Sequence, residues 1–320
     1  MGNKIDLSQA LIHQRYSAKH IFFFFLSLCI VSVVSSTITY ILLVPQSKLY
    51  SLSQILTTPS PTPPIIENAT QANQEKVDVQ QDNQVGNTSN NQVILHGSRN
   101  NKQIALTFDA EMTTFMRDEL RSGKVATDYD KRIVDTLNKT NTKATFFLTG
   151  MWITIYPDIT KQLAQNPLFE LGSHSYTDSS FSGSCYGLTQ LSDTQAVAQV
   201  GEAEFLLKIY GGIENQLFRF PGGCYSQRNI DLIAKAYDTI VHWDVTGGDG
   251  FNNNTQQIVA SVVNNTQNGS IIILHLNGAP VAPKTADALP TIITSLKAKG
   301  YEFVKVNELL GLPYETRTGL

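Results

Sequence analysis

The chain has 320 residues, of which 42% are hydrophobic and 16% charged, so it can form one large globular domain with accessory segments, or two domains. A net charge of -3 without a basic block argues against nucleic acid as the main partner. The chain has three cysteines: Cys29 lies in an apolar N-terminal run, and Cys185 and Cys224 lie beyond it. This small number excludes a disulfide-dense scaffold and a cysteine-ligated zinc finger.

An uncharged apolar run occupies residues 21–44. At about 1.5 Å of helix rise per residue, it reaches roughly 36 Å and can cross a bilayer core of about 30 Å. Lys4, Arg15 and Lys19 precede the run, with a single acidic residue against them. The positive-inside rule therefore places the N-terminus in the cytoplasm and everything after residue 44 outside.

A cleaved signal peptide is the main alternative, but its apolar core usually spans about 7–15 residues and ends at small residues. A buried helix of a soluble protein is the other alternative. Residues 45–92 are rich in Pro, Ser, Thr, Asn and Gln, and cannot bury enough apolar surface to offset the entropy of ordering. We therefore expect a cytoplasmic segment 1–20, a single transmembrane helix 21–44, a disordered linker 45–92 and an extracytoplasmic domain 93–320, within reach of a cell-wall glycan.

From residue 93 onward, β-like runs alternate with helix-like stretches. The expected strands are 104–108, 144–148, 169–172, 218–220, 239–245, 270–276 and 302–306. The expected helices are 128–138, 192–210, 227–237, 255–268 and 286–299. Ser192 is a candidate N-cap, Gly211-Gly212 is a candidate stop, and Pro290 offers an alternative start for the last helix. This alternation predicts an α/β fold whose parallel sheet closes, or nearly closes, into a barrel.

Polar residues follow several of these strands, at the end where a parallel α/β barrel brings distant residues into one pocket. Asp109 is placed there as a base or metal ligand, or else as a helix N-cap or a solvated turn residue. Glu111 can reach the same pocket or lie on a loop. His174 and Asp178, four residues apart, can share one face of a helical turn and chelate a cation, or form a surface hydrogen-bonded pair.

His275 closes the apolar run 271–275, where a lone histidine would be a satisfied core residue. Two further histidines, His174 and His242, lie in or beside similar positions, which favours a functional role. Asp249 could orient His275, and Arg219 could clamp a carboxylate; a structural ion pair is the alternative for both.

Together these residues resemble the polysaccharide deacetylase family, which carries the NodB-homology domain and forms carbohydrate esterase family four. The resemblance runs from about residue 93 to 310. The family has five motifs: Thr-Phe-Asp-Asp, His-Ser/Thr-Xaa-Xaa-His, Arg-Xaa-Pro-Xaa-Gly, an Asp after a Trp-containing strand, and Leu-Xaa-Xaa-His or similar. They resemble, in this order, 107–110, 174–178, 219–223, Asp249 after Trp243, and 272–275. It implies a distorted (β/α)7 barrel of the NodB-homology type. The Trp that usually follows the fourth motif's Asp is Gly250 here.

The sequence departs from the family at two metal-binding positions. The family's second aspartate is Ala110 here, and its second histidine is Asp178. By resemblance, Asp109 is the general base and His174 a retained metal ligand. Asp178 and Glu111 can supply oxygen ligands in place of the missing groups, unless Asp109 itself moves onto the cation. One imidazole and two carboxylates suit zinc, and also manganese, iron or cobalt.

The resemblance implies a hydrolase that removes N-acetyl groups from amino sugars of peptidoglycan or another polysaccharide by metal-assisted attack of water. Asp109, held by Arg219, would take the water's proton. A backbone N–H near Gly222 would meet the oxyanion together with the metal, and His275, positioned by Asp249, would protonate the leaving amine.

Two other functions are compatible with parts of the pattern. A tethered glycan-binding module with an inactive site would explain Ala110 and Asp178. A glycosidase would use two carboxylates and leave His174 and His275 without a role. Cys185 and Cys224 follow the second and third motifs and could form a disulfide that braces two loops outside the cytoplasm, or remain two thiols.

Overall fold

The structure is a computed structural model, and it describes residues 92–213, 217–237 and 239–312. The expected cytoplasmic segment, transmembrane helix and nearly all of the linker lie outside these residues. Among the residues that are described, no helix is both long and apolar enough to span a bilayer.

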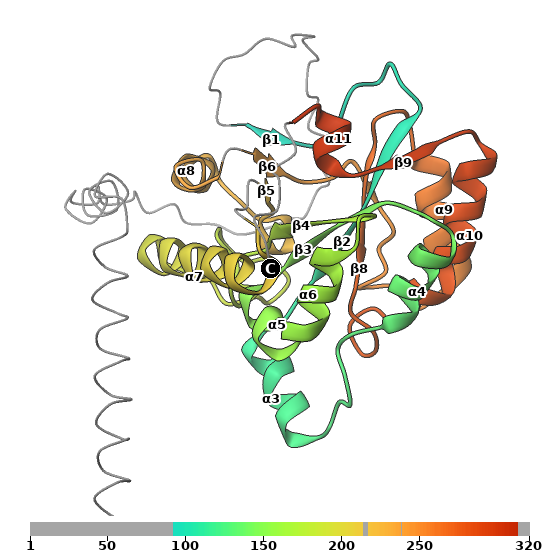
Figure 1. Cartoon of the computed structure of the whole chain (residues 1–320). Helices are drawn as coiled ribbons and strands as arrows, with labels where there is room; N and C mark the ends of the chain where they lie inside the picture. Colours follow the sequence, from blue (N-terminus) through green and yellow to red (C-terminus); the bar gives the residue numbers. More distant parts are fainter. Residues whose placement is uncertain (1–91, 214–216, 238, 313–320) are drawn as a thin grey trace, which may run out of the picture. The chain divides into compact units, whose positions relative to one another are not determined.

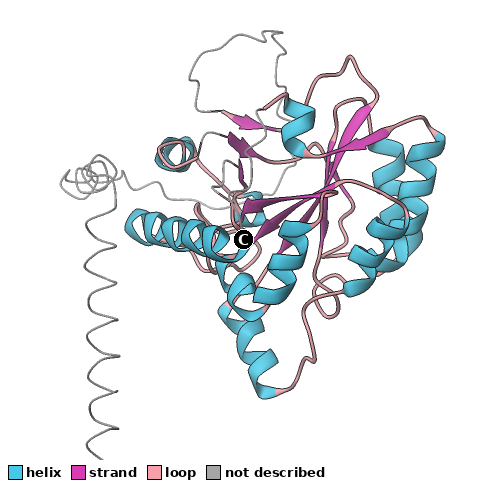
Figure 2. Ribbon diagram, viewed as in Figure 1, coloured by secondary structure: helices cyan, strands magenta, loops and turns pink. Residues whose placement is uncertain are grey.

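The core of the domain is a parallel sheet surrounded by helices (Figures 1 and 2). Its strands are β1 Val93–Ile94, β2 Gln103–Ala110, β3 Ala144–Leu148, β4 Phe169–Ser173, β5 Leu217–Phe218, β6 Thr239–Val241, β7 Val245–Thr246, β8 Ile271–His275 and β9 Glu302–Val304. They are ordered β1-β6-β5-β4-β3-β2-β8-β7, with β9 also paired to β2. Every strand pair is parallel, as the alternating pattern predicted.

The strand expected at 239–245 is split in two, and the split completes the curl of the sheet. β6 pairs with β5 and β1, whereas β7 pairs with β8 on the other side. Between them, Asp244 leaves the strand path: its carboxylate accepts from the Ile271 N–H at 2.9 Å and from Arg99 at 2.7 Å. No ladder joins β1 to β7 within the described ranges, so the sheet is a curled half-barrel, and the prediction of a distorted barrel holds in this coarser form.

Helices cover the outside of the curl, except the last, whose Val306 lies in the apolar cluster inside it. They are α3 Thr114–Ser122, α4 Lys131–Lys139, α5 Gly150–Ile155, α6 Pro157–Gln165, α7 Asp193–Gly211, α8 Gln227–Ile233, α9 Thr255–Asn265, α10 Thr285–Ala298 and α11 Val306–Leu310. Figure 1 shows α4, α9 and α10 grouped on one side and α5, α6 and α7 on the other. The five expected helices are present with shifted ends, whereas α3, α5, α6 and α11 were not expected.

The sequence predicted the capping residues of one helix correctly and offered a wrong start for another. Ser192 caps α7 in a capping box, and Gly212 ends it in a left-handed conformation. The alternative start of the last helix at Pro290 is wrong, because α10 begins at Thr285 and passes through the proline. Leu289 and Ile292, which flank it, are fully buried in the main core, and this packing offsets the hydrogen bond that proline cannot make.

Strand alternation decides which side chains reach the inside of the curl. Along β2, Ile104, Leu106, Phe108 and Ala110 belong to the main apolar core beneath the helices, whereas Ala105 belongs to a second cluster with Phe147, Val241 and Ile271. Thr107 and Asp109 share the parity of Ala105 and therefore point inward. The same rule directs the polar residues at the strand ends toward one interior site.

Candidate active site

Asp109 is held by a buried arginine from another strand end. Arg219, directly after β5, donates from Nη1 to Asp109 Oδ1 at 2.7 Å and to Thr107 Oγ1 at 2.9 Å. Its remaining donors reach the Val241 and His242 carbonyls at 3.3 and 3.1 Å. Both side chains are buried, so the guanidinium fixes one carboxylate oxygen of Asp109 and leaves Oδ2 directed at the site.

The Arg219 guanidinium also lies over an aromatic ring. Its central carbon lies 3.9 Å from the centroid of Phe147 and 5.4 Å from that of Trp243. Such packing removes water from the ion pair and fixes the plane of the guanidinium. The position of Asp109 is therefore set before any ligand enters.

His174 presents one ring nitrogen to the same point in space. Its Nδ1–H donates to the Arg219 carbonyl at 3.0 Å, which leaves Nε2 as the nitrogen with a free lone pair. That Nε2 lies 3.6 Å from Asp109 Oδ2 and 3.6 Å from Asp178 Oδ1. Burial lowers the pKa of His174, so the ring is neutral near pH 7. A neutral imidazole with one anchored nitrogen is the form that binds a metal ion.

The turn that carries Asp178 is not helical, contrary to the geometry expected for the His174–Asp178 spacing. Ser175 and Asp178 have φ values of +64° and +49°, in the left-handed region. Gln199 of α7 holds the turn by accepting from Thr177 Oγ1 at 2.9 Å and from the Thr177 N–H at 3.1 Å. The turn still brings the two side chains together, by bending rather than by helical stacking.

Three of the donor atoms lie close enough together to hold a divalent cation. Asp109, Glu111 and His174 each offer one ligand atom within 4.8 Å of the others. Asp178 stands outside this trio but contacts the same imidazole.

Two of the buried polar atoms, His174 Nε2 and Asp178 Oδ1, have no hydrogen-bond partner in the part of the chain that the structure describes. Burial, then Glu111 and Asp109, raise the pKa of Asp178 well above its usual range. A cation would satisfy both atoms and relieve the repulsion.

Glu111 reaches this site and Ala110 does not, because successive side chains of a strand point to opposite faces. Ala110 is fully buried in the apolar core beneath the helices. Glu111 has the parity of Asp109, and Asn277 fixes its backbone by accepting from its N–H and donating to its carbonyl, both at 2.9 Å. Its Oε1 lies 3.3 Å from His275 Nε2. Glu111 therefore links the other two members of this trio, Asp109 and His174, with the histidine at the end of β8.

His275 is oriented from behind by a buried carboxylate. Asp249 accepts from its Nδ1–H at 3.0 Å and from its backbone N–H at 2.8 Å, and the Thr285 hydroxyl donates to the same carboxylate at 2.6 Å. Burial by itself lowers the pKa of His275, but Asp249 and Glu111 outweigh it and raise the pKa well above its usual value. Burial opposes ionisation of Asp249, yet the charge of His275 and these hydrogen bonds lower its pKa.

His242 does not join the cluster. Its carbonyl accepts from Arg219, and its ring lies 2° from parallel with Trp243 at 4.8 Å. Burial, assisted by the positive charge of Arg219, lowers the pKa of His242 to about 3, so it is neutral. Its part in the site is to support Arg219. Sequence reasoning missed three other supporting residues: Thr107, Asn277 and Thr285.

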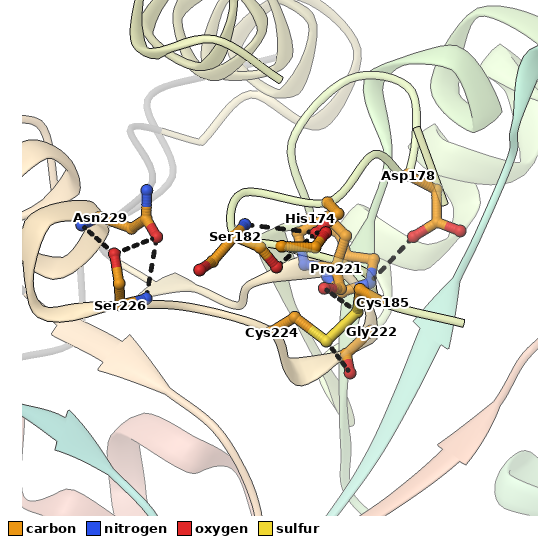
Figure 3. The surroundings of a disulfide bond; sticks show 11 residues. His174, Asp178, Ser182, Cys185, Pro221, Gly222, Cys224, Ser226 and Asn229 are labelled. Carbon is orange, nitrogen blue, oxygen red and sulfur yellow. Dashed lines mark hydrogen bonds and ion pairs between the residues drawn. A yellow bond between two sulfur atoms is a disulfide. The ribbon is translucent and has the colours of Figure 1, made fainter. Parts of the chain in front are cut away.

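A disulfide joins the two loops that carry His174 and Arg219. Cys185 and Cys224 are bonded, which confirms the pairing that the sequence left open. Figure 3 shows the bond beside Gly222, with His174 and Asp178 nearby. Gly222 has a φ of +61°, and a Cβ there would lie 2.5 Å from Cys185 Sγ. Only glycine therefore lets the turn after Arg219 pass under the bond.

Removing this disulfide is expected to destabilise the domain. The bond closes a loop with a sequence separation of 39, and replacing both Cys185 and Cys224 with serine should lower the free energy of unfolding by about 2–4 kcal/mol. Urea unfolding measures the loss, with Cys29→Ser as the matched control that should change nothing. Alkylation of both cysteines in unreduced protein would contradict the pairing.

Comparisons with known proteins find relatives of this chain. Residues 96–239 match a family model described as polysaccharide deacetylase. A peptidoglycan-N-acetylglucosamine deacetylase of Bacillus cereus is 30% identical over 213 residues, which are 66% of this chain and 89% of that protein. The uncharacterised protein YlxY of Bacillus subtilis is 28% identical over 183 residues, 57% of this chain and 53% of that protein. The chain thus spans only about half the length of this last relative.

Solved structures show the same fold. The crystal structure of a peptidoglycan N-acetylglucosamine deacetylase bound to 4-naphthalen-1-yl-N-oxidanyl-benzamide has a TM-score of 0.60 at 25% identity, and covers 70% of this chain and 95% of that one. A CE4 family pseudoenzyme from Bacillus anthracis has a TM-score of 0.56 at 23% identity, covering 69% of each chain, and this likeness concerns the fold alone.

Proposed function

We propose, from the premise that the chain belongs to the polysaccharide deacetylase family, that it hydrolyses the N-acetyl groups of amino sugars in a cell-wall glycan. The observation that carries the proposal is the arrangement of His174 Nε2 between two buried carboxylates, with an oriented histidine, His275, nearby. Glu111 and His174 of the trio, together with Asp178 beside His174, would hold a divalent cation, zinc in the first instance, and Asp109, the third member of the trio, would stay beside it as the base. When bound, such a cation lowers the pKa of a coordinated water and polarises the acetyl carbonyl.

The residues of the chain divide the proton transfers between them. Asp109 accepts the proton of the attacking water on the oxygen that Arg219 leaves open. The N–H groups of Gly223 and Cys224 are used within their turn, so we assign the Gly222 N–H as the donor to the developing oxyanion. His275, kept protonated by Asp249, donates a proton to the departing amine nitrogen. Acetate and a free amino sugar are the products.

The activity is tested by acetate release from N-acetylated chitooligosaccharides and from peptidoglycan, with and without a chelator. We expect release that the chelator abolishes and added zinc restores. If no acetate appears from either glycan with zinc, manganese, iron(II) or cobalt, the proposal is wrong. Retained glycan binding with less than about one-tenth equivalent of metal would then favour the alternative, an inactive glycan-binding module of the same fold.

The proposed metal site can be tested by zinc affinity, separately from activity. Replacing His174 with glutamine removes the single nitrogen ligand of the site and should weaken zinc binding at least about a hundredfold. Competition against a chromophoric chelator measures the affinity without reference to activity. His96→Gln, at an exposed histidine in the loop after β1, is the matched control and should bind zinc as the unmodified protein does. Equal affinity of the His174 variant would remove this residue from the ligand set.

We also propose that the domain works outside the cytoplasmic membrane, tethered by residues 21–44 through the linker 45–92. The uncharged run and the preceding basic residues support the anchor. The Cys185–Cys224 disulfide supports an oxidising compartment, where such bonds persist. Protease added to intact cells should degrade the domain if it is exposed at the outer face, and protection of the domain would contradict this location.

A further inference from the structure

Two exposed aromatic rings meet beside the proposed active site. Phe251 is 78% exposed and Tyr186 is 71% exposed, the two highest values among the large hydrophobic side chains of the described residues. They come from separate loops, yet their ring centroids lie 5.2 Å apart with the planes tilted by 41°. Contact between two rings that both remain in water is not explained by packing of the domain core.

Both rings belong to segments that adjoin the proposed site. Tyr186 follows Cys185 of the disulfide, and its Cδ2 lies 3.4 Å from where a Cβ on Gly222 would be. Phe251 follows Gly250, whose Cβ position lies 3.2 Å from His275 Cε1. The Tyr186 ring therefore lies beside the proposed oxyanion turn, and the Phe251 ring is carried by the residue next to one that contacts the proposed general acid.

The backbone holds these rings outward at some conformational cost. Tyr186 has a φ of +48°, a region that non-glycine residues rarely occupy. The adjoining disulfide and a turn in which the Leu188 N–H donates to the Cys185 carbonyl at 2.8 Å fix this conformation. On the other loop, the Phe251 N–H donates to the Gly248 carbonyl at 3.0 Å. The fold thus fixes two apolar faces that it leaves uncovered.

A sugar ring fits this surface better than a charged or purely aliphatic ligand would. One face of a pyranose carries only C–H groups, whose positive edges pack on the negative face of an aromatic ring. Exposed apolar patches beside a site commonly bind a part of its ligand. Resting on the proposed function for the class of ligand, we propose that Tyr186 and Phe251 form a sugar-stacking platform for a glycan residue next to the one that loses its acetyl group.

The platform is tested by binding, which does not require turnover. The full-length protein is titrated calorimetrically with a hexamer of N-acetylglucosamine in the presence of a chelator. Tyr186→Ala and Phe251→Ala should each weaken binding about three- to tenfold, the range for one aromatic contact. Tyr186→Trp and Phe251→Trp should restore it. Phe205→Ala, at a 46% exposed ring in the second half of α7, is the matched control and should bind as the unmodified protein does.

The outcomes separate this inference from the proposed function. Weakened binding in the two alanine variants supports the platform even if the protein releases no acetate. If acetate is released, the same substitutions should raise KM for the hexamer more than they lower kcat. Unchanged binding in both alanine variants, or no hexamer binding by the unmodified protein, overturns the platform. It is also overturned if the substitutions leave hexamer binding intact but abolish binding to phosphatidylglycerol vesicles, because the rings would then contact a membrane.

Discussion

Replacing Asp109 with asparagine is expected to lower kcat for acetate release by about a thousandfold, within the range of general-base catalysis. The amide cannot accept a proton from water, although it keeps the shape of the carboxylate and one acceptor for Arg219. Because Arg219 is buried, it would also lose the one anion to which it is hydrogen-bonded in the described part of the chain. Breaking a buried pair in this way costs about 3–5 kcal/mol, so the variant should also unfold at a lower temperature.

A second aspartate–arginine pair allows the loss of the base to be separated from the loss of stability. Asp244 accepts from Arg99 at 2.7 Å and from the amino end of β8, at the opposite end of that strand from His275. Asp244→Asn should lower stability and leave acetate release per folded molecule within about twofold. If Asp109→Asn retains more than about a tenth of the kcat of the unmodified protein, Asp109 is not the base.

The fold was predictable wherever an apolar run was long and bounded by clear signals. The strand 144–148 is found with the expected bounds, and α7 has its expected capping residue. The strand expected at 239–245 was not predictable as two pieces. Its residues are apolar enough for a single strand, and only the tertiary contacts of Asp244 with Arg99 and Ile271 divide it.

The site was predictable in its members and less so in its geometry. Asp109, His174 and His275 follow apolar runs, so a parallel sheet had to bring them to one end. Strand parity explains why Glu111 shares their face and Ala110 does not, and this rule could have been applied to the sequence. The left-handed turn before Asp178 has no such signal, because neither Ser175 nor Asp178 is a glycine.

The supporting residues were hidden for a different reason. Asn277 and Thr285 stand after β8, where a polar side chain is ordinarily a surface residue. Only the fold shows that Asn277 fixes the backbone of Glu111 and that Thr285 donates to Asp249. Each acts across more than thirty positions of sequence, beyond the reach of any local pattern.

Replacing His275 with glutamine should lower kcat by about a hundred- to ten-thousandfold, because the amide of glutamine cannot protonate the leaving amine. Asp249→Asn tests the same role through pH. The Asp249 contact keeps the His275 pKa above its usual value, so activity should persist at neutral pH and fall as the pH rises through that pKa. With the carboxylate removed, the His275 pKa falls, and the alkaline limb of kcat/KM should move to lower pH by about 1–2 units.

Thr285→Val provides the control, since it removes one hydrogen bond to Asp249 and keeps the charge. Its alkaline limb should move less than that of Asp249→Asn. The free energy of unfolding should also fall at high pH. Because the pKa of His275 is raised in the folded protein, its protonation stabilises the fold fully below the unfolded pKa of about 6.5. This stabilisation is lost as the pH rises through the folded pKa. An alkaline limb that stays in place in Asp249→Asn would show that a group other than His275 supplies the proton.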